Sequence, residues 1–184
     1  MSNTFDAEIR PALLPVECGE ILAVSRHCVS NELLDVSPTV NGFVLSRKCH
    51  TKTLSWEYPL TAADIQHCST VFVAVAMGEV IGWCGCVNHQ WNRTMELQHL
   101  YVDIDYRNCG IGSRLLTSAI NHAAKLLYRN LWVETQNTNV KAYDFYIAKG
   151  FELRGLNLDL YDPHQLAFPQ CALYMVMNIE QPPA

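Results

Sequence analysis

The chain has 184 residues, of which 49% are hydrophobic and 17% charged, and a formal net charge of −5. This composition is typical of a globular protein and excludes a disordered chain. The acidic balance argues against nucleic acid as a partner, because phosphate binding requires clustered Lys and Arg. No run reaches the ~18 apolar residues that cross a bilayer, so we expect no membrane partner and a single domain over residues 1–184.

The N-terminus and the cysteines point to a reducing compartment. Met1–Arg10 lacks a basic segment followed by an apolar one, so we expect no secretory signal and a cytoplasmic protein. The eight cysteines lack the paired two-residue spacers of a zinc site. Only Cys84 and Cys86 are close, on one face of a strand-like run. We expect reduced core thiols and no metal.

The first third of the chain gives weak signals. Residues 16–28 have helical spacing of apolar side chains. Residues 31–60 are punctuated by prolines and by Asn41-Gly42, which predicts loops with a short strand near 43–46. The role of this segment stays open, and a substrate-recognition loop is one interpretation.

From residue 70 the pattern sharpens. Apolar runs at 71–76 and 80–87 flank a Met77-Gly78-Glu79 turn and predict a hairpin, followed by a strand over about 94–103. A helix is predicted over about 111–128, because five apolar residues recur every four positions: Ile111, Leu115, Ala119, Ala123 and Leu127.

The last third alternates strands and a helix. We expect a strand at 131–135, then a helix capped by Asn137 or Thr138 and ending at Gly150. Two late strands follow at 151–156 and 173–179. The predicted fold is therefore α/β, with a mixed, mostly antiparallel central sheet flanked by helices.

A glycine-containing loop between a strand and a helix is the first candidate site. In Arg107–Gly112 the glycines let the backbone approach a ligand, and the following helix presents N–H groups and a partial positive charge. A diphosphate suits such a turn. It is neither a P-loop nor a dinucleotide fingerprint, and a tight packing turn is the competing interpretation.

The second candidate is a helix face. Asn139, Ala142 and Tyr146 stand at i, i+3 and i+7, with the outer two about 10 Å apart along the axis. An amide, a small residue and a phenol on one face suit a polar ligand. The alternative is that Tyr146 packs against the sheet with its hydroxyl at the edge.

Together these motifs resemble the GNAT N-acetyltransferase superfamily. Tyr106–Gly112 resembles its acetyl-CoA pyrophosphate loop, although Asn108 replaces a typical glycine; Asn tolerates a left-handed backbone, so we expect the loop to survive. Residues 132–139, Phe145-Tyr146 and Gly150-Phe151 resemble the second cofactor motif. Residues 134–137 and 156–162 most resemble the streptothricin acetyltransferase group. The resemblance implies the acyl-CoA N-acyltransferase fold, with a cofactor-binding core over about 70–178.

The resemblance also implies roles. Acetyl-CoA would be the cosubstrate, with Tyr146 near its sulfur as the acid for the departing thiolate. The cofactor-binding residues would be Leu100, Tyr101, Val102, Arg107, Asn108, Cys109, Gly110, Ile111, Gly112, Ser113, Asn139 and Tyr146. A neutral amine would attack the thioester directly in a ternary complex, with strand N–H groups stabilising the oxyanion.

The general base is the least defined role. Relatives of the streptothricin group often carry an acidic pair where Gln98-His99 stands. Glu96, on the same strand face as Gln98, is the preferred base through water; His99, expected on the opposite face, or water alone are the alternatives. A covalent role for Cys109 is disfavoured, because it lies in the variable part of the diphosphate loop.

The expected enzyme acetylates a primary amine on a small cationic molecule, such as a streptothricin-like antibiotic, and would confer antibiotic resistance. The alternatives are a protein lysine or N-terminal acetyltransferase and a non-catalytic acyl-CoA-binding sensor. Gln98 favours the sensor, whereas Asn139 and Tyr146 together favour an enzyme. A homodimer is expected, since dimers are the commonest soluble oligomers.

Overall fold

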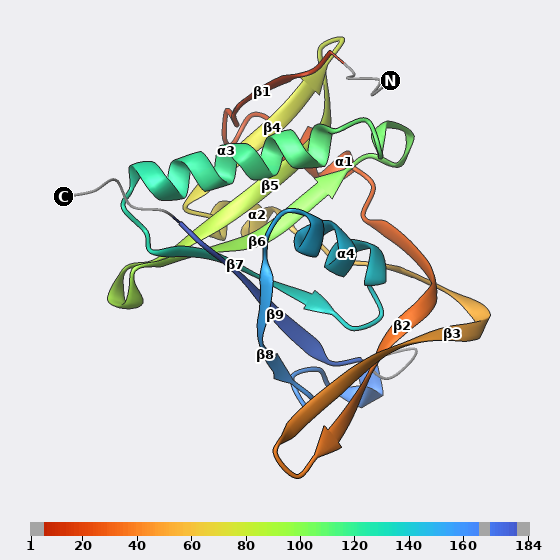
Figure 1. Ribbon diagram of the computed structural model, residues 1–184. Coiled ribbons are helices and arrows are strands. Elements are labelled where there is room, and N and C mark those ends of the chain that lie inside the picture. The colour runs from red at the N-terminus through yellow and green to blue at the C-terminus, as the bar shows by residue number, and fades with distance from the viewer. Residues whose placement is uncertain (1–5, 166–169, 180–184) are drawn as a thin grey trace. The chain divides into compact units, whose positions relative to one another are not determined.

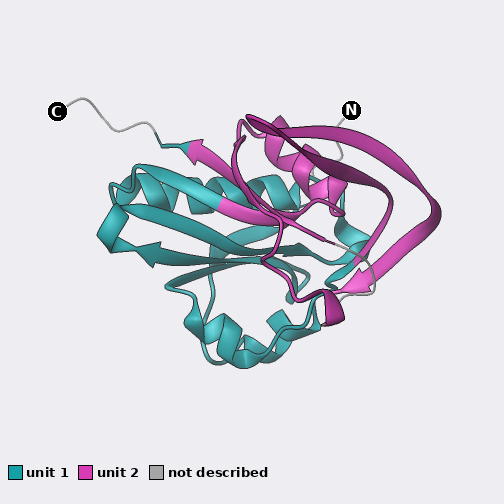
Figure 2. Cartoon of the chain, turned by 90° about the horizontal axis from the view of Figure 1, so that it is seen from below, with its two compact units in different colours: residues 1–27, 58–132, 178–184 teal, residues 28–57, 133–177 magenta. Residues whose placement is uncertain are grey.

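The computed structural model describes residues 6–165 and 170–179. The chain divides into two compact units (Figure 2): unit 1 comprises residues 1–27, 58–132 and 178–184, and unit 2 comprises residues 28–57 and 133–177. None of the described helices combines the length and apolar character needed to cross a bilayer. The α/β class, with a mostly antiparallel sheet and flanking helices, is confirmed.

The sheet of unit 1 has the strand order β1-β4-β5-β6-β7. Neighbours from β1 to β6 are antiparallel, whereas β6 and β7 are parallel. The predicted hairpin is confirmed, with Met77 and Gly78 at positive φ in its turn. The strands are β1 (Glu8–Pro11), β4 (Thr70–Ala76), β5 (Glu79–His89), β6 (Thr94–Val102) and the start of β7 (Asn130–Gln136).

Helix α3 (Ile111–Lys125) covers one face of this sheet (Figure 1). Four members of the predicted stripe, from Ile111 to Ala123, are fully buried. The fifth assignment is wrong: Leu127 lies beyond the helix end at φ 59° and is 52% exposed. The chain leaves the helix in a left-handed conformation there, and Tyr128 is buried instead.

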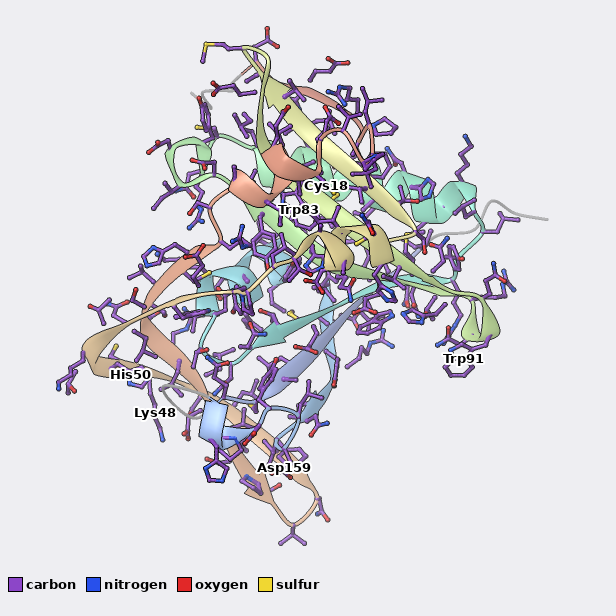
Figure 3. The ribbon with its side chains drawn as sticks, turned by 180° about the vertical axis from the view of Figure 1, so that it is seen from behind. Cys18, Lys48, His50, Trp83, Trp91 and Asp159 are labelled. Atoms are coloured by element: carbon purple, nitrogen blue, oxygen red, sulfur yellow. The ribbon has the colours of Figure 1, made fainter. Side chains whose placement is uncertain are left out.

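The opposite face is covered by α1 (Cys18–Ala23) and α2 (Ala62–His67). Trp83 is fully buried there among Ile21, Val24 and Ile65, and Figure 3 labels it beside α1. Helix α1 is shorter than the predicted 16–28. The Arg26 guanidinium donates hydrogen bonds to the carbonyl oxygens of Leu22 and Val24 at its C-terminal end, and strand β2 starts at His27.

Unit 2 contains the end of β7 and the order β7-β9-β8, with β8 and β9 antiparallel. Among the residues of unit 2 that the structure describes, the other elements are a two-stranded ribbon and an α-helix. The bounds are β2 (His27–Thr39), β3 (Gly42–Glu57), α4 (Val140–Ala148), β8 (Glu152–Asn157) and β9 (Ala172–Asn178). Short 3-10 turns complete the chain at Gln90–Asn92 and Ile104–Tyr106 in unit 1 and at Pro163–Gln165 in unit 2.

The prediction of loops over residues 31–60 is wrong for most of that segment. Strands β2 and β3 form a long hairpin around Val40 and Asn41. Most of its side chains are exposed or half-buried on both faces, so no apolar alternation marks the strands. The Asn41-Gly42 pair, a hairpin signal, was the available clue.

The start of α4 also differs from expectation. Its N-cap is Asn139, not Asn137 or Thr138. Asn137 is buried and serves elsewhere: its side chain donates to the Leu34 carbonyl over 3.0 Å and accepts from the Cys171 N–H over 2.9 Å. The predicted end is confirmed, since Gly150 follows the helix at φ 88°.

Candidate active site

The end of β6 carries three of the residues expected to bind the cofactor. Leu100, Tyr101 and Val102 pair with Cys84, Trp83 and Gly82 of β5 on one edge. On the other edge of β6, within unit 1, Thr94–Glu96 pair with Asn130–Trp132 of β7. Because a strand has two hydrogen-bonding edges, the second edge of Leu100–Val102 has N–H and C=O groups that β5 does not use.

A bulge at Gln98 changes which face His99 occupies. The register passes from Cys86↔Leu97 to Gly85↔His99, so Gln98 is an extra residue in β6. Glu96 pairs with Val87, two residues from Gly85 on β5, and cross-strand partners share a face. Glu96 and His99 therefore lie on the same face, and the expectation that His99 points to the opposite face is wrong.

His99 lies in an aromatic cluster. Its ring centroid is 5.0 Å from that of Trp83 and 6.1 Å from that of Tyr101. Burial lowers the pKa of His99 to about 4, with Asp64 acting in the opposite direction. His99 is therefore a neutral and weakly basic imidazole at neutral pH.

Glu96 has a partner that the sequence did not reveal. Its Oε2 lies 3.0 Å from Nε2 of His89, at the end of β5. The His89 ring packs against Trp132, with centroids 5.8 Å apart. Glu96 is thus held on the sheet face and is not a freely solvated carboxylate.

The glycine-containing loop has the conformation that its sequence requires. Asn108 has φ 63° and Gly110 has φ 83°, so the prediction that Asn108 would accept a left-handed backbone is confirmed. Gly110 is the N-cap of α3, and no side chain caps that end. The N–H groups of Ile111, Gly112 and Ser113 therefore have no intrahelical acceptor, which suits an anion.

The Arg107 side chain is occupied by the protein itself. Its guanidinium donates to the carbonyl oxygens of Val102 at 2.9 Å, His27 at 2.9 Å and Ser25 at 3.3 Å. It thereby ties the loop to the end of β6 and to the segment after α1. Three of its five N–H groups thus bind backbone oxygens of the protein, a set of contacts that the motif alone does not reveal.

Cys109 turns towards the loop backbone. Its thiol is half-buried and lies 3.6 Å from the Arg107 carbonyl oxygen, to which it donates. All eight cysteines lie within the described residues and are free thiols. Across residues 6–165 and 170–179, no group of three His, Cys, Asp or Glu side chains has the arrangement to hold a metal ion.

Unit 2 holds the second motif. The Asn139 Oδ1 accepts a hydrogen bond from the Ala142 N–H over 3.3 Å, so this side chain caps α4. Tyr146, in the last turn of the helix, is 6% exposed. Its ring lies 5.3 Å from those of Phe145 and Phe151. Tyr146 is therefore packed between the aromatic rings of Phe145 and Phe151.

A polar network in unit 2 was missed at the sequence level. The Tyr161 hydroxyl donates to the Glu134 carboxylate and accepts from Nε2 of Gln136 over 2.9 Å. These residues belong to the two segments, 134–137 and 156–162, that resemble the streptothricin acetyltransferase group. The segments are separate in the sequence and come together only in the folded protein. No pattern in the sequence reports such a pairing across 27 positions.

The family follows from a comparison with known proteins. Residues 40–151 match the model of the acetyltransferase (GNAT) family, which is more than half of the chain. The chain belongs to the acetyltransferase (GNAT) family. The resemblance inferred from the two motifs is confirmed, and the protein is an acetyl-CoA-dependent N-acetyltransferase.

Individual relatives also support the assignment to the GNAT family. The chain is 26% identical to streptothricin acetyltransferase of Escherichia coli over 163 residues, 89% of this chain and 92% of that protein. The crystal structure of nourseothricin acetyltransferase superposes with a TM-score of 0.86 and 26% identity, covering 96% of this chain and all of that one. The fold is also shared with the putative streptothricin acetyltransferase of Bacillus anthracis strain Ames, solved with acetyl coenzyme A, at a TM-score of 0.80 and 21% identity, covering 97% of this chain and 100% of that one.

Proposed function

We propose that this protein moves the acetyl group of acetyl-CoA to a primary amine on a small cationic molecule of the streptothricin type. The similarity to the streptothricin acetyltransferase of Escherichia coli, which runs along nearly the whole of both chains, is the observation that carries the proposal. The net charge of −5 suits a cationic acceptor. Such an activity would inactivate an antibiotic and confer resistance.

Each cofactor-binding residue has a proposed contact. The backbone of Leu100–Val102 would bind the pantetheine arm and the acetyl carbonyl along the β6 edge that faces away from β5. The N–H groups of Arg107–Ser113 would bind the diphosphate. Because the Asn139 oxygen caps α4, its Nδ2 group would be the donor to the cofactor arm.

The transfer itself would be direct. The acceptor amine forms a bond to the thioester carbon, the carbonyl oxygen becomes an oxyanion held by strand N–H groups, and the carbon–sulfur bond breaks. The thiolate takes the hydroxyl proton of Tyr146, which is later restored from solvent. Glu96 receives the surplus proton of the amine through a water molecule. His99 is a weaker candidate base, since its ring is packed in the cluster with Trp83 and Tyr101, where burial disfavours the imidazolium that proton uptake would form.

A panel of amines tests the acceptor class. Thiol release from acetyl-CoA is measured with streptothricin, polyamines, free lysine and lysine peptides, and acetyl-CoA binding is measured by calorimetry in parallel. Release with the small cations supports the proposal. Release with peptides alone would identify a protein acetyltransferase, and tight binding without release would identify a sensor.

The absence of a covalent intermediate is separately testable. Cys109→Ala is expected to keep the full transfer rate, because the thiol is turned towards the Arg107 carbonyl. An acetyl group trapped on Cys109 after incubation with acetyl-CoA alone would overturn direct transfer.

We further propose that the protein is a cytoplasmic homodimer without nucleic-acid or membrane partners. Sedimentation tests the oligomeric state, and cell fractionation tests the location.

A further inference from the structure

His89 and Glu96 form a polar pair on one face of the unit 1 sheet. In the sheet register, Glu96 lies directly between Val87 of β5 and Trp132 of β7. His89 is two residues beyond Val87, and therefore on the same face. Three neighbouring strands thus place an imidazole, a carboxylate and an indole together.

The hydrogen bond fixes which imidazole nitrogen holds the hydrogen. The Nε2 of His89 is 3.0 Å from the Oε2 of Glu96. An ionised carboxylate only accepts hydrogen bonds, so Nε2 must be the protonated nitrogen. The bond uses Oε2 and leaves Oε1 for another donor, such as a water molecule between Glu96 and an amine.

The ring of His89 is itself held. It packs against Trp132 with centroids 5.8 Å apart and planes inclined by 34°. The two side chains of the pair are 30% and 17% exposed, so they are accessible to water yet partly enclosed. A glutamate without such a partner would sample several rotamers, which weakens any role that depends on position.

We infer that His89 is a positioning residue for the reaction: its Nε2–H and its packing on Trp132 hold the Glu96 carboxylate so that Oε1 faces the acceptor amine through water. The inference rests on the proposed role of Glu96 as the base. Because His89 would act through Glu96, its loss is expected to affect turnover and not cofactor binding.

A double-mutant cycle tests this. His89→Phe keeps a ring against Trp132 but removes the donor, and His89→Gln restores a side-chain N–H. His89→Phe is expected to lower kcat on the order of tenfold, less than loss of the base itself, with the KM for acetyl-CoA unchanged. His89→Gln is expected to recover most of that loss. His67→Phe, at an exposed position of α2, is the matched control.

The Glu96→Gln background separates the possible failures. There, His89→Phe is expected to cause no further loss. An equal loss in both backgrounds overturns the positioning role while leaving Glu96 as the base. A Glu96→Gln enzyme with full kcat overturns both this inference and the proposed base.

A second measurement needs no His89 variant and therefore does not depend on that variant folding. Nitrogen-15 NMR of the imidazole in the native protein is expected to find the hydrogen on Nε2, and in Glu96→Gln this preference is expected to weaken. The Nδ1–H tautomer in the native protein would overturn the inference.

Discussion

Nη1 of Arg107 lies 2.9 Å from the carbonyl oxygen of His27, eighty residues earlier in the chain. The same guanidinium also binds the Val102 carbonyl at the end of β6. One side chain therefore joins the glycine-containing loop, the strand before it and the segment after α1. The position of the loop relative to the strand edge depends on this contact.

Arg107→Ala should loosen that junction. Loss of hydrogen bonds to a charged group is expected to lower the free energy of unfolding by about 1.5–3 kcal/mol and to weaken acetyl-CoA binding. Urea denaturation and calorimetry measure the two effects. Arg154→Ala, which removes only the surface pair with Glu152, serves as the control. Unchanged cofactor affinity in Arg107→Ala would contradict the positioning role.

The two roles given to Asn139 can be separated by substitution. Asn139→Asp keeps an oxygen that caps α4, so stability is expected to be retained, whereas the Nδ2 donor is lost and acetyl-CoA should bind more weakly. Asn139→Ala removes both and is expected to lose about 1 kcal/mol of stability as well. If Asn139→Asp binds acetyl-CoA normally, the proposed cofactor contact is wrong.

Tyr146→Phe tests the acid. The ring would keep its packing between Phe145 and Phe151, so the fold should survive, and kcat is expected to fall roughly a hundredfold or more. The rate of acetyl transfer at a saturating concentration of acceptor measures this change in kcat. Tyr143→Phe, on the same helix and packed in the core of unit 2, should retain its rate. Full activity in Tyr146→Phe would rule the phenol out as the proton donor.

His99 should make stability depend on pH. Its pKa is about 4 in the folded protein, below the ordinary 6.5, so the unfolded chain binds more protons between these values. The free energy of unfolding is therefore expected to fall as pH decreases from about 6.5 to about 4, by up to about 3 kcal/mol. In His99→Gln this pH dependence of the free energy of unfolding should be weaker, which denaturation at a series of pH values measures. An equal pH dependence in both proteins would contradict the burial of a neutral imidazole.

Apolar patterning predicted the elements from residue 70 onwards, because strands such as β4 and the buried face of α3 lie in a core. It failed for β2 and β3, whose side chains meet solvent on both faces. The bulge at Gln98 could not be anticipated, since nothing in a single strand's sequence records a register shift with its neighbour.

The backbone conformation of the candidate site could be predicted from the sequence, whereas the partners of its side chains could not. The glycine loop and Asn108 follow from local conformation, which the sequence encodes directly. The partners of Arg107 and Glu96 depend on residues that only the fold brings near. Asn139 was expected on the face of this helix, whereas the structure makes it the N-cap of α4, with its oxygen bound to the Ala142 N–H.

The most direct test of the proposed activity is a competition between acceptors. Streptothricin and a lysine peptide are mixed at equal concentration with acetyl-CoA and the enzyme, and both products are followed by mass spectrometry. The proposal predicts that streptothricin gains one acetyl group, with equivalent release of coenzyme A, before the peptide changes. Preferential acetylation of the peptide, or no acetylation of streptothricin by an enzyme that binds acetyl-CoA, would contradict it.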